Sequence, residues 1–598
     1  MAPMAGDVCG APDQGKACAN LRQVQETVGH HPHAHLHQTD RRHQSLAKRT
    51  PIGSLDYFDK KLENLRRFVG FNGVYTNPLH PTHGGFRVSP KIRKEIERRK
   101  REIARRLDKD DNRGCDQPIM TASNIHYEIA DRTRATAAGG IGAMHLLVRK
   151  LGLDEAIDRH LDVLKIHLPY FDSDHVLNIA YNLLAGGECL EHLELLRTNV
   201  AYLNALGARR IPDPTTAGDF CRRFDTSRIY MLQQLFNATR LKVWRQQPES
   251  FFDEAILDAD GTMVETTGEC KEGMEINYKG QWGYHPLVVS LANTGEPLYL
   301  VNRSGNRPSY ENAAWYFDRS IEICRKAGFR KILLRGDTDF TQTTQLDGWD
   351  KDGVKFIFGI DATDKLYELA EKLPQEAWKT LQRQVKHPVK TKRRKRRKNV
   401  KQQIVEEREF ENIRTVKERV AEFTYQPGNC AKAYRIVVVM KELETYRGQL
   451  KFEETARCFF YITNVVEKPA EEIVFGANDR CGQENLLGVH KDDVRSLTAP
   501  LDNLLSNWAY MVMAALAWSL KAWSALMLPE SGRWKEKHRE EKMKLLRMEF
   551  STFRQALMNI PAQIIRTGRK IIYRLLAWNP WQSVFFRLLD QLNRPLTC

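Results

Sequence analysis

The sequence predicts a mixed α/β protein, and three features of the chain support this fold class. Short apolar runs typical of buried strands begin at Ala255 and alternate with amphipathic helical segments. Helical patterns precede this part of the chain from Ala137 and return after Asn507. The chain has 598 residues, 42% of them hydrophobic, which is enough for several domains with well-filled cores.

The charge and the cysteine usage narrow the class of protein. Lys and Arg total 92 against 75 acidic residues, and the net charge of +17 predicts a polyanionic partner such as nucleic acid or a membrane surface. The 11 cysteines include no CxxC pair, and residues 1–20 lack the apolar core of a signal peptide. We therefore expect free thiols in a reducing cytoplasm and no structural zinc.

Residues 1–120 are predicted to be a partly disordered extension. The histidine-rich tract at 30–37 is interpreted as a flexible tail rather than a transition-metal site, because no carboxylate or cysteine frames it. Residues 91–107 place isoleucines at helical spacing among dense Arg and Lys, which predicts a basic amphipathic helix. Its polar face is either a solvated surface or an arm that follows the DNA backbone.

Residues 121–250 are predicted to be helical and to bind DNA. Apolar residues recur there at helical spacing, and Gly186, Gly187 and the turn at 212–214 interrupt the pattern. Short helices with tight turns are compatible with a helix-turn-helix reader, although no recognition helix stands out. The expected helices include 143–151, 153–161, 175–184 and 190–196.

An α/β core is predicted in two parts, residues 251–361 and 475–530. The first part has the pattern of three strands, a helix, a strand, a helix and a strand, which is the element order of a ribonuclease-H-like sheet. In that topology the first and fourth strands lie side by side. The expected elements are strands at 256–260, 282–292, 297–301, 331–335 and 354–360, and a helix at 310–327.

A β-rich insertion at 362–474 interrupts this core. Residues 433–441 and 457–466 have the β-branched and aromatic content of strands. Residues 380–405 contain no acid, and we interpret the cations there as a loop that faces DNA rather than a solvated tail. These cations are Lys392, Arg393, Arg394, Lys395, Arg396, Arg397 and Lys398.

Two carboxylates lie at the ends of predicted core strands, and a third lies in the helix with which the core continues after the insertion. Asp260 closes the first strand in I-L-D-A-D-G-T, Asp337 follows the fourth in K-I-L-L-R-G-D-T-D-F, and Glu484 lies in a later helix. Carboxylate oxygens from separate elements suit Mg²⁺, and two such ions can act on both oxygens of a phosphoryl displacement. Asp258 and Asp339 remain alternatives, since residues two apart share one face of a strand.

The stretch around Glu484 carries cations at the spacing R-x3-E-x6-K. On one helix, Arg480, Glu484 and Lys491 would project from a single stripe. A carboxylate between two cations makes sense if the carboxylate holds a metal and the cations meet phosphate.

The rest of the chain is predicted to be helical. The apolar segment 507–528 is interrupted by a lysine and two serines, which favours a core helix over a membrane span. Residues 531–598 are expected to form a helical C-terminal region that caps the core or dimerises.

These motifs resemble those of bacterial insertion-sequence transposases of the DDE class, specifically those with a β-rich insertion before the final glutamate. The matching motifs are D-G-T at Asp260, R-G-D-T-D-F around Asp337, and R-x3-E-x6-K beginning at Arg480. The similarity spans roughly residues 140–523. In that family a tyrosine stands three residues before the arginine, where this chain has Ala477.

The resemblance implies a cut-and-paste transposase that binds the terminal inverted repeats of its own insertion sequence, nicks DNA and joins a 3′-hydroxyl to a target phosphodiester. Relatives with the insertion often pass through a DNA hairpin. The catalytic and metal-binding residues would be Asp260, Asp337 and Glu484, holding two Mg²⁺ ions that Mn²⁺ can replace, with Arg480 and Lys491 on phosphates.

The same resemblance implies the partners and the place of action. The partners would be double-stranded DNA, both at the element ends and at the target, and a second copy of the chain in a synaptic homodimer. No membrane would be involved, and the protein would act in the bacterial cytoplasm at the nucleoid.

Two other functions use the same features. A metal-dependent, structure-specific nuclease would share the fold and the acids but would not join strands. A domesticated DNA-binding protein would be marked by the loss of an acid, and all three are present. Trp349 and Trp378 are the tryptophans nearest the insertion, and we favour core packing for both over holding a flipped base.

Overall fold

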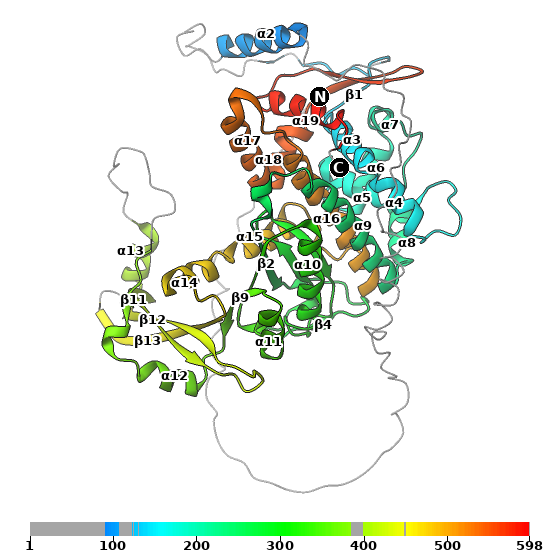
Figure 1. Cartoon of the computed structure of the whole chain (residues 1–598). Coiled ribbons are helices and arrows are strands. Elements are labelled where there is room, and N and C mark those ends of the chain that lie inside the picture. Colours follow the sequence, from blue (N-terminus) through cyan, green and yellow to red (C-terminus); the bar gives the residue numbers. More distant parts are fainter. Residues whose placement is uncertain are drawn as a thin grey trace, which may run out of the picture. The chain divides into compact units, whose positions relative to one another are not determined.

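The structure, a computed structural model, describes residues 90–106, 122–123, 125–129, 131–383, 399–447 and 450–596, which all belong to one compact unit. A nine-stranded sheet forms the centre of this unit, and many of the helices gather on one side of it (Figure 1). The predicted mixed α/β fold class is confirmed.

The large sheet has the strand order β10-β11-β12-β13-β9-β8-β2-β6-β7. Strand β2 is parallel to β8, and β8 is parallel to β9, whereas β6 is antiparallel to β2 and to β7. The first and fourth strands that the sequence predicts, β2 and β8, are therefore neighbours. The strands are β2 (Glu254–Gly261), β6 (Leu287–Leu291), β7 (Glu296–Val301), β8 (Lys331–Gly336), β9 (Lys355–Ile360), β10 (Lys379–Thr380), β11 (Glu411–Tyr425), β12 (Tyr434–Arg447) and β13 (Leu450–Thr463).

The insertion extends the central sheet instead of forming a separate one. Strand β13 pairs antiparallel with β9, and β12, β11 and β10 follow it outward. Val437 and Val439 of β12 share a buried cluster with Leu333 and Ile357 of the core strands. The insertion is thus held by the same hydrophobic core as the strands that carry the acids.

Helices cover the sheet and carry the chain back from the insertion. They are α10 (Ala313–Ala327), α11 (Thr343–Lys351), α12 (Asp364–Glu371), α14 (Ala470–Asn478), α15 (Cys481–Asp492) and α16 (Leu504–Leu526). A small three-stranded sheet of β3 (Val264–Glu265), β5 (Trp282–Tyr284) and β4 (Glu275–Ile276) lies beside them. Helix α13 (Val400–Glu407), which precedes β11, has no buried residue.

Helix α16 is the central helix of the molecule. By length and composition it is the one helix among the described residues that could cross a membrane, yet the whole of its apolar window is buried inside the protein. Its indoles are anchored to the sheet, because Trp508 Nε1 donates to the Leu300 carbonyl at 2.6 Å and Trp518 Nε1 to that of Gly295 at 2.7 Å. The packing observed is therefore that of the predicted core helix.

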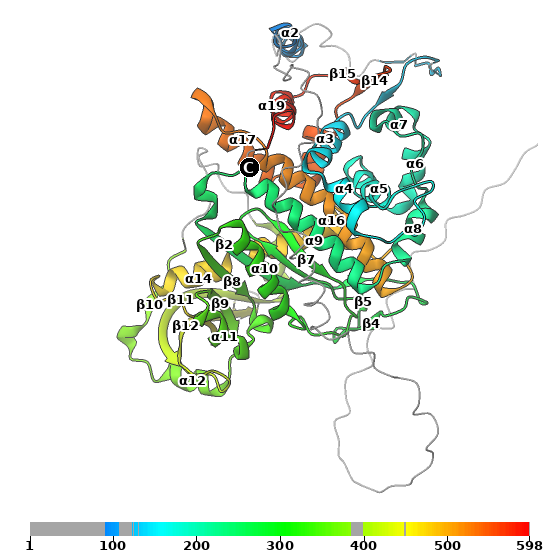
Figure 2. The ribbon, with the colours of Figure 1, turned by 45° about the vertical axis from the view of Figure 1, so that its right-hand side comes forward.

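Helix α9 (Thr226–Trp244) lies beside α16 and also contacts β7, and a helical layer packs against these two helices (Figure 2). The helices of this layer are α3 (Ile141–Leu151), α4 (Leu153–His160), α5 (Asp172–Leu184), α6 (Leu193–Arg197), α7 (Val200–Leu206) and α8 (Pro214–Arg222). All four helices predicted between 143 and 196 are present, the last split into a short 3₁₀ turn, Leu190–His192, and α6.

The C-terminal region differs from the prediction. It contains α17 (Lys535–Arg547), α18 (Phe550–Phe553) and α19 (Gln582–Leu592), but also a hairpin of β14 (Ala562–Arg566) and β15 (Ile571–Leu575). β14 pairs with β1 (Ala135–Thr136), so residues far apart in the chain complete one sheet. The prediction of a wholly helical end was wrong here, since Ile-rich runs on both sides of a basic turn satisfy their backbones as strands.

Two other predicted elements need correction. Residues 282–292 are two strands in different sheets, β5 and β6, separated at Pro286, which has no backbone N–H for a continuous ladder. Arg480 and Lys491 do not share one uninterrupted helix, because α14 ends at Asn478 and α15 begins at Cys481.

The predicted basic helix is present as α2 (Pro90–Arg106). Ile92, Ile96 and Arg99 form its half-buried side, and the Arg99 guanidinium donates to the Leu575 carbonyl of β15 at 3.1 Å. The other Lys and Arg side chains of α2 are exposed.

Candidate catalytic site

Two of the predicted acids meet at one edge of the sheet because their strands are parallel neighbours. Asp260 is the penultimate residue of β2, and Asp337 directly follows β8. Parallel strands end at the same edge, so the register Asp258 opposite Arg335 brings the two tips together. Glu484 approaches them from the first turn of α15, which packs against β2.

One guanidinium joins all three acids. Arg480 Nη1 lies 3.1 Å from Asp260 Oδ2 and 3.8 Å from Asp337 Oδ2, and its Nη2 lies 3.5 Å from Glu484 Oε1. Arg480 is mostly buried, whereas Glu484 is 58% exposed and reaches the site from the solvent side. The structure therefore brings Asp260, Asp337, Glu484 and Arg480 to one place.

The turn that carries Asp337 is packed tightly against β9. Asp337 Oδ1 accepts the backbone N–H of Asp339 at 3.1 Å, and the Thr341 hydroxyl donates to the Gly359 carbonyl. A Cβ on Gly359 would lie 3.0 Å from the Thr338 nitrogen, closer than nearly all real contacts of this kind. Glycine at 359 thus lets the Asp337 turn sit directly on the sheet.

Helix α15 is fixed to the sheet by the residue before Glu484. Gln483 is buried, its amide donates to the Val288 carbonyl at 3.0 Å, and its carbonyl accepts the hydroxyl of Ser290. Both partners belong to β6, next to β2. These bonds set the rotation of α15 and with it the direction in which Glu484 projects.

Burial makes the two aspartates hold protons more strongly than usual. The pKa of Asp260 is raised to about 7, mainly by burial; the Arg480 charge and the hydrogen bond from the Gly261 N–H oppose the rise, and the charges of Asp337 and Glu484 add to it. Burial also raises the pKa of Asp337, again opposed by Arg480. Two carboxyls with raised pKa at one sheet edge are typical of a functional site.

The alternative acids lie nearby but have other surroundings. Asp258 is fully buried, and both its oxygens accept from Arg335 at 2.7 Å, so its charge is already neutralised within the sheet. Asp339 lines a cleft of about 900 Å³ together with Arg307, Tyr310 and Asn429. Asp260 and Asp337 are therefore the better candidates, because both reach Arg480.

The donor set fits a divalent cation in chemistry. Carboxylate oxygens are the ligands that Mg²⁺ prefers, and the exposed Glu484 leaves room for water and substrate oxygens. In the described residues, however, no three Asp, Glu, His or Cys side chains are close enough to hold one ion together. The Arg480 guanidinium stands between the acids that would share it.

The other predicted DNA contacts fall in different places. Lys491 lies in the last turn of α15, beyond the acids. Residues 392–398 lie outside the described residues. Trp349 is buried and its indole donates to Asp318 at 2.8 Å, which is the packing role that the sequence favoured.

Sequence reasoning missed three polar residues that build the site. Besides Gln483, these are His285 and Arg303, which lie so close to Gly261 that a Cβ there would meet both. Arg303 is buried and donates to the carbonyls of His285, Pro308, Ser309 and Glu311, which ties residues 308–311 to His285. No local pattern marks these residues, because their partners are distant or are backbone carbonyls.

One protein family and a solved structure are similar to this chain. No curated protein matches the chain. A solved structure described as the piggyBac transposase synaptic complex with hairpin DNA is similar with a TM-score of 0.33 and 11% identity, covering 71% of this chain and 84% of that one. The family described as Transposase DDE domain group 1 matches residues 120–596, which include all three acids and Arg480. Since that match covers most of the chain, the protein belongs to the family of transposases with a group 1 DDE domain.

Proposed function

We propose that the protein is a cut-and-paste DDE transposase that binds the terminal inverted repeats of its own bacterial insertion sequence and catalyses metal-dependent cleavage and strand transfer. One observation carries this proposal. Carboxylates from three distant segments, Asp260, Asp337 and Glu484, converge on one guanidinium at the edge of the central sheet. The family of transposases to which the chain belongs supplies the reaction class.

The sheet supports a ribonuclease-H-like core. Its five core strands have the order β7-β6-β2-β8-β9, with an antiparallel β2-β6-β7 meander followed by parallel β8 and β9. This is the topology that the element order of the sequence predicts. Strands β10 to β13 would be the β-rich insertion, since they lie in the chain between β9 and α15, the helix that carries Glu484.

The three acids Asp260, Asp337 and Glu484 would hold the divalent metal ions that DDE transposase domains generally use. Two Mg²⁺ ions bound there would supply Lewis-acid activation of the attacking oxygen and stabilise the leaving oxygen. The protein contributes position and charge: Gln483 directs Glu484, Gly359 seats the Asp337 turn, and Arg480 and Lys491 offer positive charge to phosphates. Because burial raises the pKa of Asp260, a cation bound there would compete with a proton for its carboxylate.

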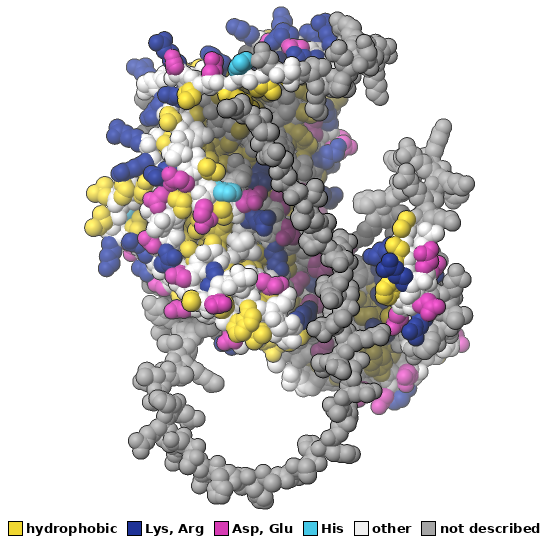
Figure 3. Space-filling view, turned by 180° about the vertical axis from the view of Figure 1, so that it is seen from behind, with side chains coloured by type: hydrophobic (Ala, Val, Ile, Leu, Met, Phe, Trp, Pro, Cys, Tyr) yellow, Lys and Arg dark blue, Asp and Glu magenta, His cyan; other side chains and the backbone are white. Residues whose placement is uncertain are grey.

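DNA would be guided to this site by basic surfaces. Lys and Arg side chains gather along the upper edge of the molecule, over α2 (Figure 3). Residues 392–398 of the insertion add seven cations. Such surfaces bind the backbone of double-stranded DNA through counterion release, at the element ends and at the target. A synaptic homodimer, a hairpin intermediate and action at the nucleoid of the cytoplasm belong to the same proposal.

Neutralising the cations at 392–398 should weaken DNA binding without changing the catalytic site. With all seven replaced by Gln, we expect the slope of log affinity against log salt to become shallower by several units, since each lost phosphate contact contributes about 0.9. Fluorescence anisotropy on a 40-bp duplex from 50 to 300 mM salt measures it. An unchanged slope would show that this segment does not contact DNA. Unchanged Mn²⁺ binding is the control for an intact catalytic site.

The decisive experiment separates a transposase from a nuclease on the same fold. A plasmid carrying the gene's flanking DNA, including any inverted repeats, is incubated with the protein, Mg²⁺ and a target plasmid. We expect excision at the repeats and joined products with the target. Hydrolysis at junctions without any joined product would instead establish a structure-specific nuclease, and binding without cleavage a domesticated DNA-binding protein.

A further inference from the structure

The contacts of Arg480 are those expected of a counterion to the acids rather than of a side chain that binds phosphate. Its Nη1 lies between Asp260 Oδ2 and Asp337 Oδ2, and its Nη2 faces Glu484 Oε1, so one side chain carries positive charge to all three acids. It is the first residue before α15, and its ion pair with Asp260 is shielded from water, whereas Asp337 and Glu484 are more exposed. Contacts of this kind between charged groups are stronger than those at the surface.

Arg480 and a shared divalent ion would compete for the same carboxylate oxygens and the same space. Mg²⁺ binds carboxylate oxygens at about 2.0–2.1 Å. An ion between Asp260 and Asp337 would therefore occupy the space in which Nη1 now lies. An ion that replaced the guanidinium would leave Arg480 without its contacts to the acids.

We propose that Arg480 is an exchangeable counterion of the catalytic acids: it pairs with them until divalent ions take its place, and it then turns to the DNA phosphate. This inference rests on the proposed function and adds the order in which the metal ions and the DNA phosphate are bound. Ion binding and phosphate binding become coupled through one side chain. By linkage, each must then strengthen the other by the same factor.

The exchange makes a directional prediction about metal affinity. Arg480→Gln removes the competitor, so Mn²⁺ should bind about tenfold more tightly than to the wild type, the scale of one charged hydrogen bond. Arg480→Lys keeps the charge but cannot reach all three acids, and it should tighten binding only a few-fold. Calorimetric titration of the full chain with Mn²⁺ at pH 8.5, where protons compete little, measures both. A purely structural Arg480 would give the opposite sign, because its loss would disorder the acids and weaken binding.

The second measurement tests where Arg480 goes. DNA affinity is compared with Ca²⁺ and with EDTA, on a duplex carrying the flanking repeat and a 3′-dideoxy end. The wild type should gain affinity on adding Ca²⁺, and Arg480→Gln should lose most of that gain. The matched variant Lys491→Gln, whose cation lies farther along the same helix, should lower affinity equally in both conditions.

The outcomes separate this inference from the proposed function. If Asp260→Asn leaves Mn²⁺ binding intact, the catalytic site itself has been assigned wrongly. If Asp260→Asn abolishes binding but Arg480→Gln leaves the Mn²⁺ affinity unchanged or weaker, only the exchange is overturned. Should Arg480→Gln fail to fold, a looser Mn²⁺ complex in Arg480→Lys would overturn it equally.

Discussion

Asp260→Asn should abolish DNA cleavage and at the same time stabilise the folded protein at pH 8. Asp260 is the most buried of the three acids and contacts Arg480 at 3.1 Å. Loss of a shared cation ligand costs several kcal/mol of transition-state stabilisation, which corresponds to a rate decrease of about 10³-fold or more. Initial rates of plasmid nicking in Mg²⁺ measure the loss, and Asp337→Asn should behave alike.

The gain in stability follows from the raised pKa of Asp260. The folded-state pKa is about 7 against an ordinary value of 3.8, so between these pH values the folded protein binds more protons than the unfolded chain. Stability from this group is therefore fully present below about pH 3.8 and is lost as the pH rises to about 7. At pH 8 the wild type carries the whole penalty of a buried anion, and Asn removes it.

We expect a stabilisation of roughly 1–3 kcal/mol for Asp260→Asn at pH 8 in EDTA and a clearly smaller one at pH 5, because the difference disappears only below about pH 3.8. Denaturant unfolding at both pH values measures the difference. Adding Mn²⁺ should stabilise the wild type and leave the variant unchanged. A variant that is less stable at pH 8 would mean that Asp260 has a structural role and that its charge is already compensated by Arg480.

The positions of the acids were predictable because strand ends are encoded locally. The apolar runs before Asp260 and Asp337 predict strands, and the element order predicts that those strands are neighbours, which the sheet confirms. The sequence favours Asp260 over Asp258 because Asp260 lies nearer the end of the strand and matches the D-G-T motif, although both share a strand face. The register of β8 adds a reason that the sequence does not contain, because it pairs Asp258 with Arg335.

The role of Arg480 and the anchoring of α15 depend on contacts that no local pattern encodes. Helical spacing predicts that Arg480 and Glu484 share a face, and they do contact each other, but the helix begins only after Arg480. The ion pairs of Arg480 with Asp260 and Asp337 join residues from three distant segments. Gln483 likewise pairs with β6, about 190 residues away, and its neighbours in sequence do not distinguish it from an exposed glutamine.

The strongest effect on stability should come from Glu296, which lies far from the catalytic acids. Glu296 of β7 is completely buried and accepts from Arg240 Nε at 2.9 Å, Trp244 Nε1 at 3.0 Å and Trp523 Nε1 at 2.8 Å. Arg240 and Trp244 belong to α9 and Trp523 to α16, so this carboxylate joins these two helices to the sheet. Without the Glu296 carboxylate, each of these three N–H groups would lack its acceptor.

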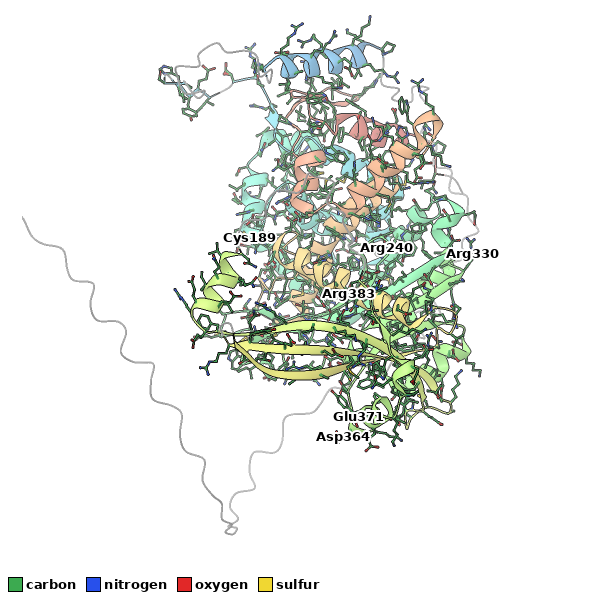
Figure 4. The ribbon with its side chains drawn as sticks, turned by 90° about the vertical axis from the view of Figure 1, so that its left-hand side faces the viewer. Cys189, Arg240, Arg330, Asp364, Glu371 and Arg383 are labelled. Atoms are coloured by element: carbon green, nitrogen blue, oxygen red, sulfur yellow. The ribbon has the colours of Figure 1, made fainter. Side chains whose placement is uncertain are left out.

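Glu296→Ala should therefore destabilise the protein by about 3–5 kcal/mol, the cost of leaving a buried charge unpaired. Arg240→Met should cost a similar amount, and the double variant Arg240→Leu with Glu296→Leu should cost less than the sum, because no lone charge remains. Arg330, which pairs with Asp253 at the exposed surface, is the matched control, and Arg330→Ala should cost less than about 1 kcal/mol (Figure 4). Denaturant midpoints, or thermal inactivation rates if unfolding is irreversible, measure all four. If Glu296→Ala were as mild as Arg330→Ala, water would have to reach the buried pair, and the Glu296 carboxylate would contribute little to holding α9 and α16 against the sheet.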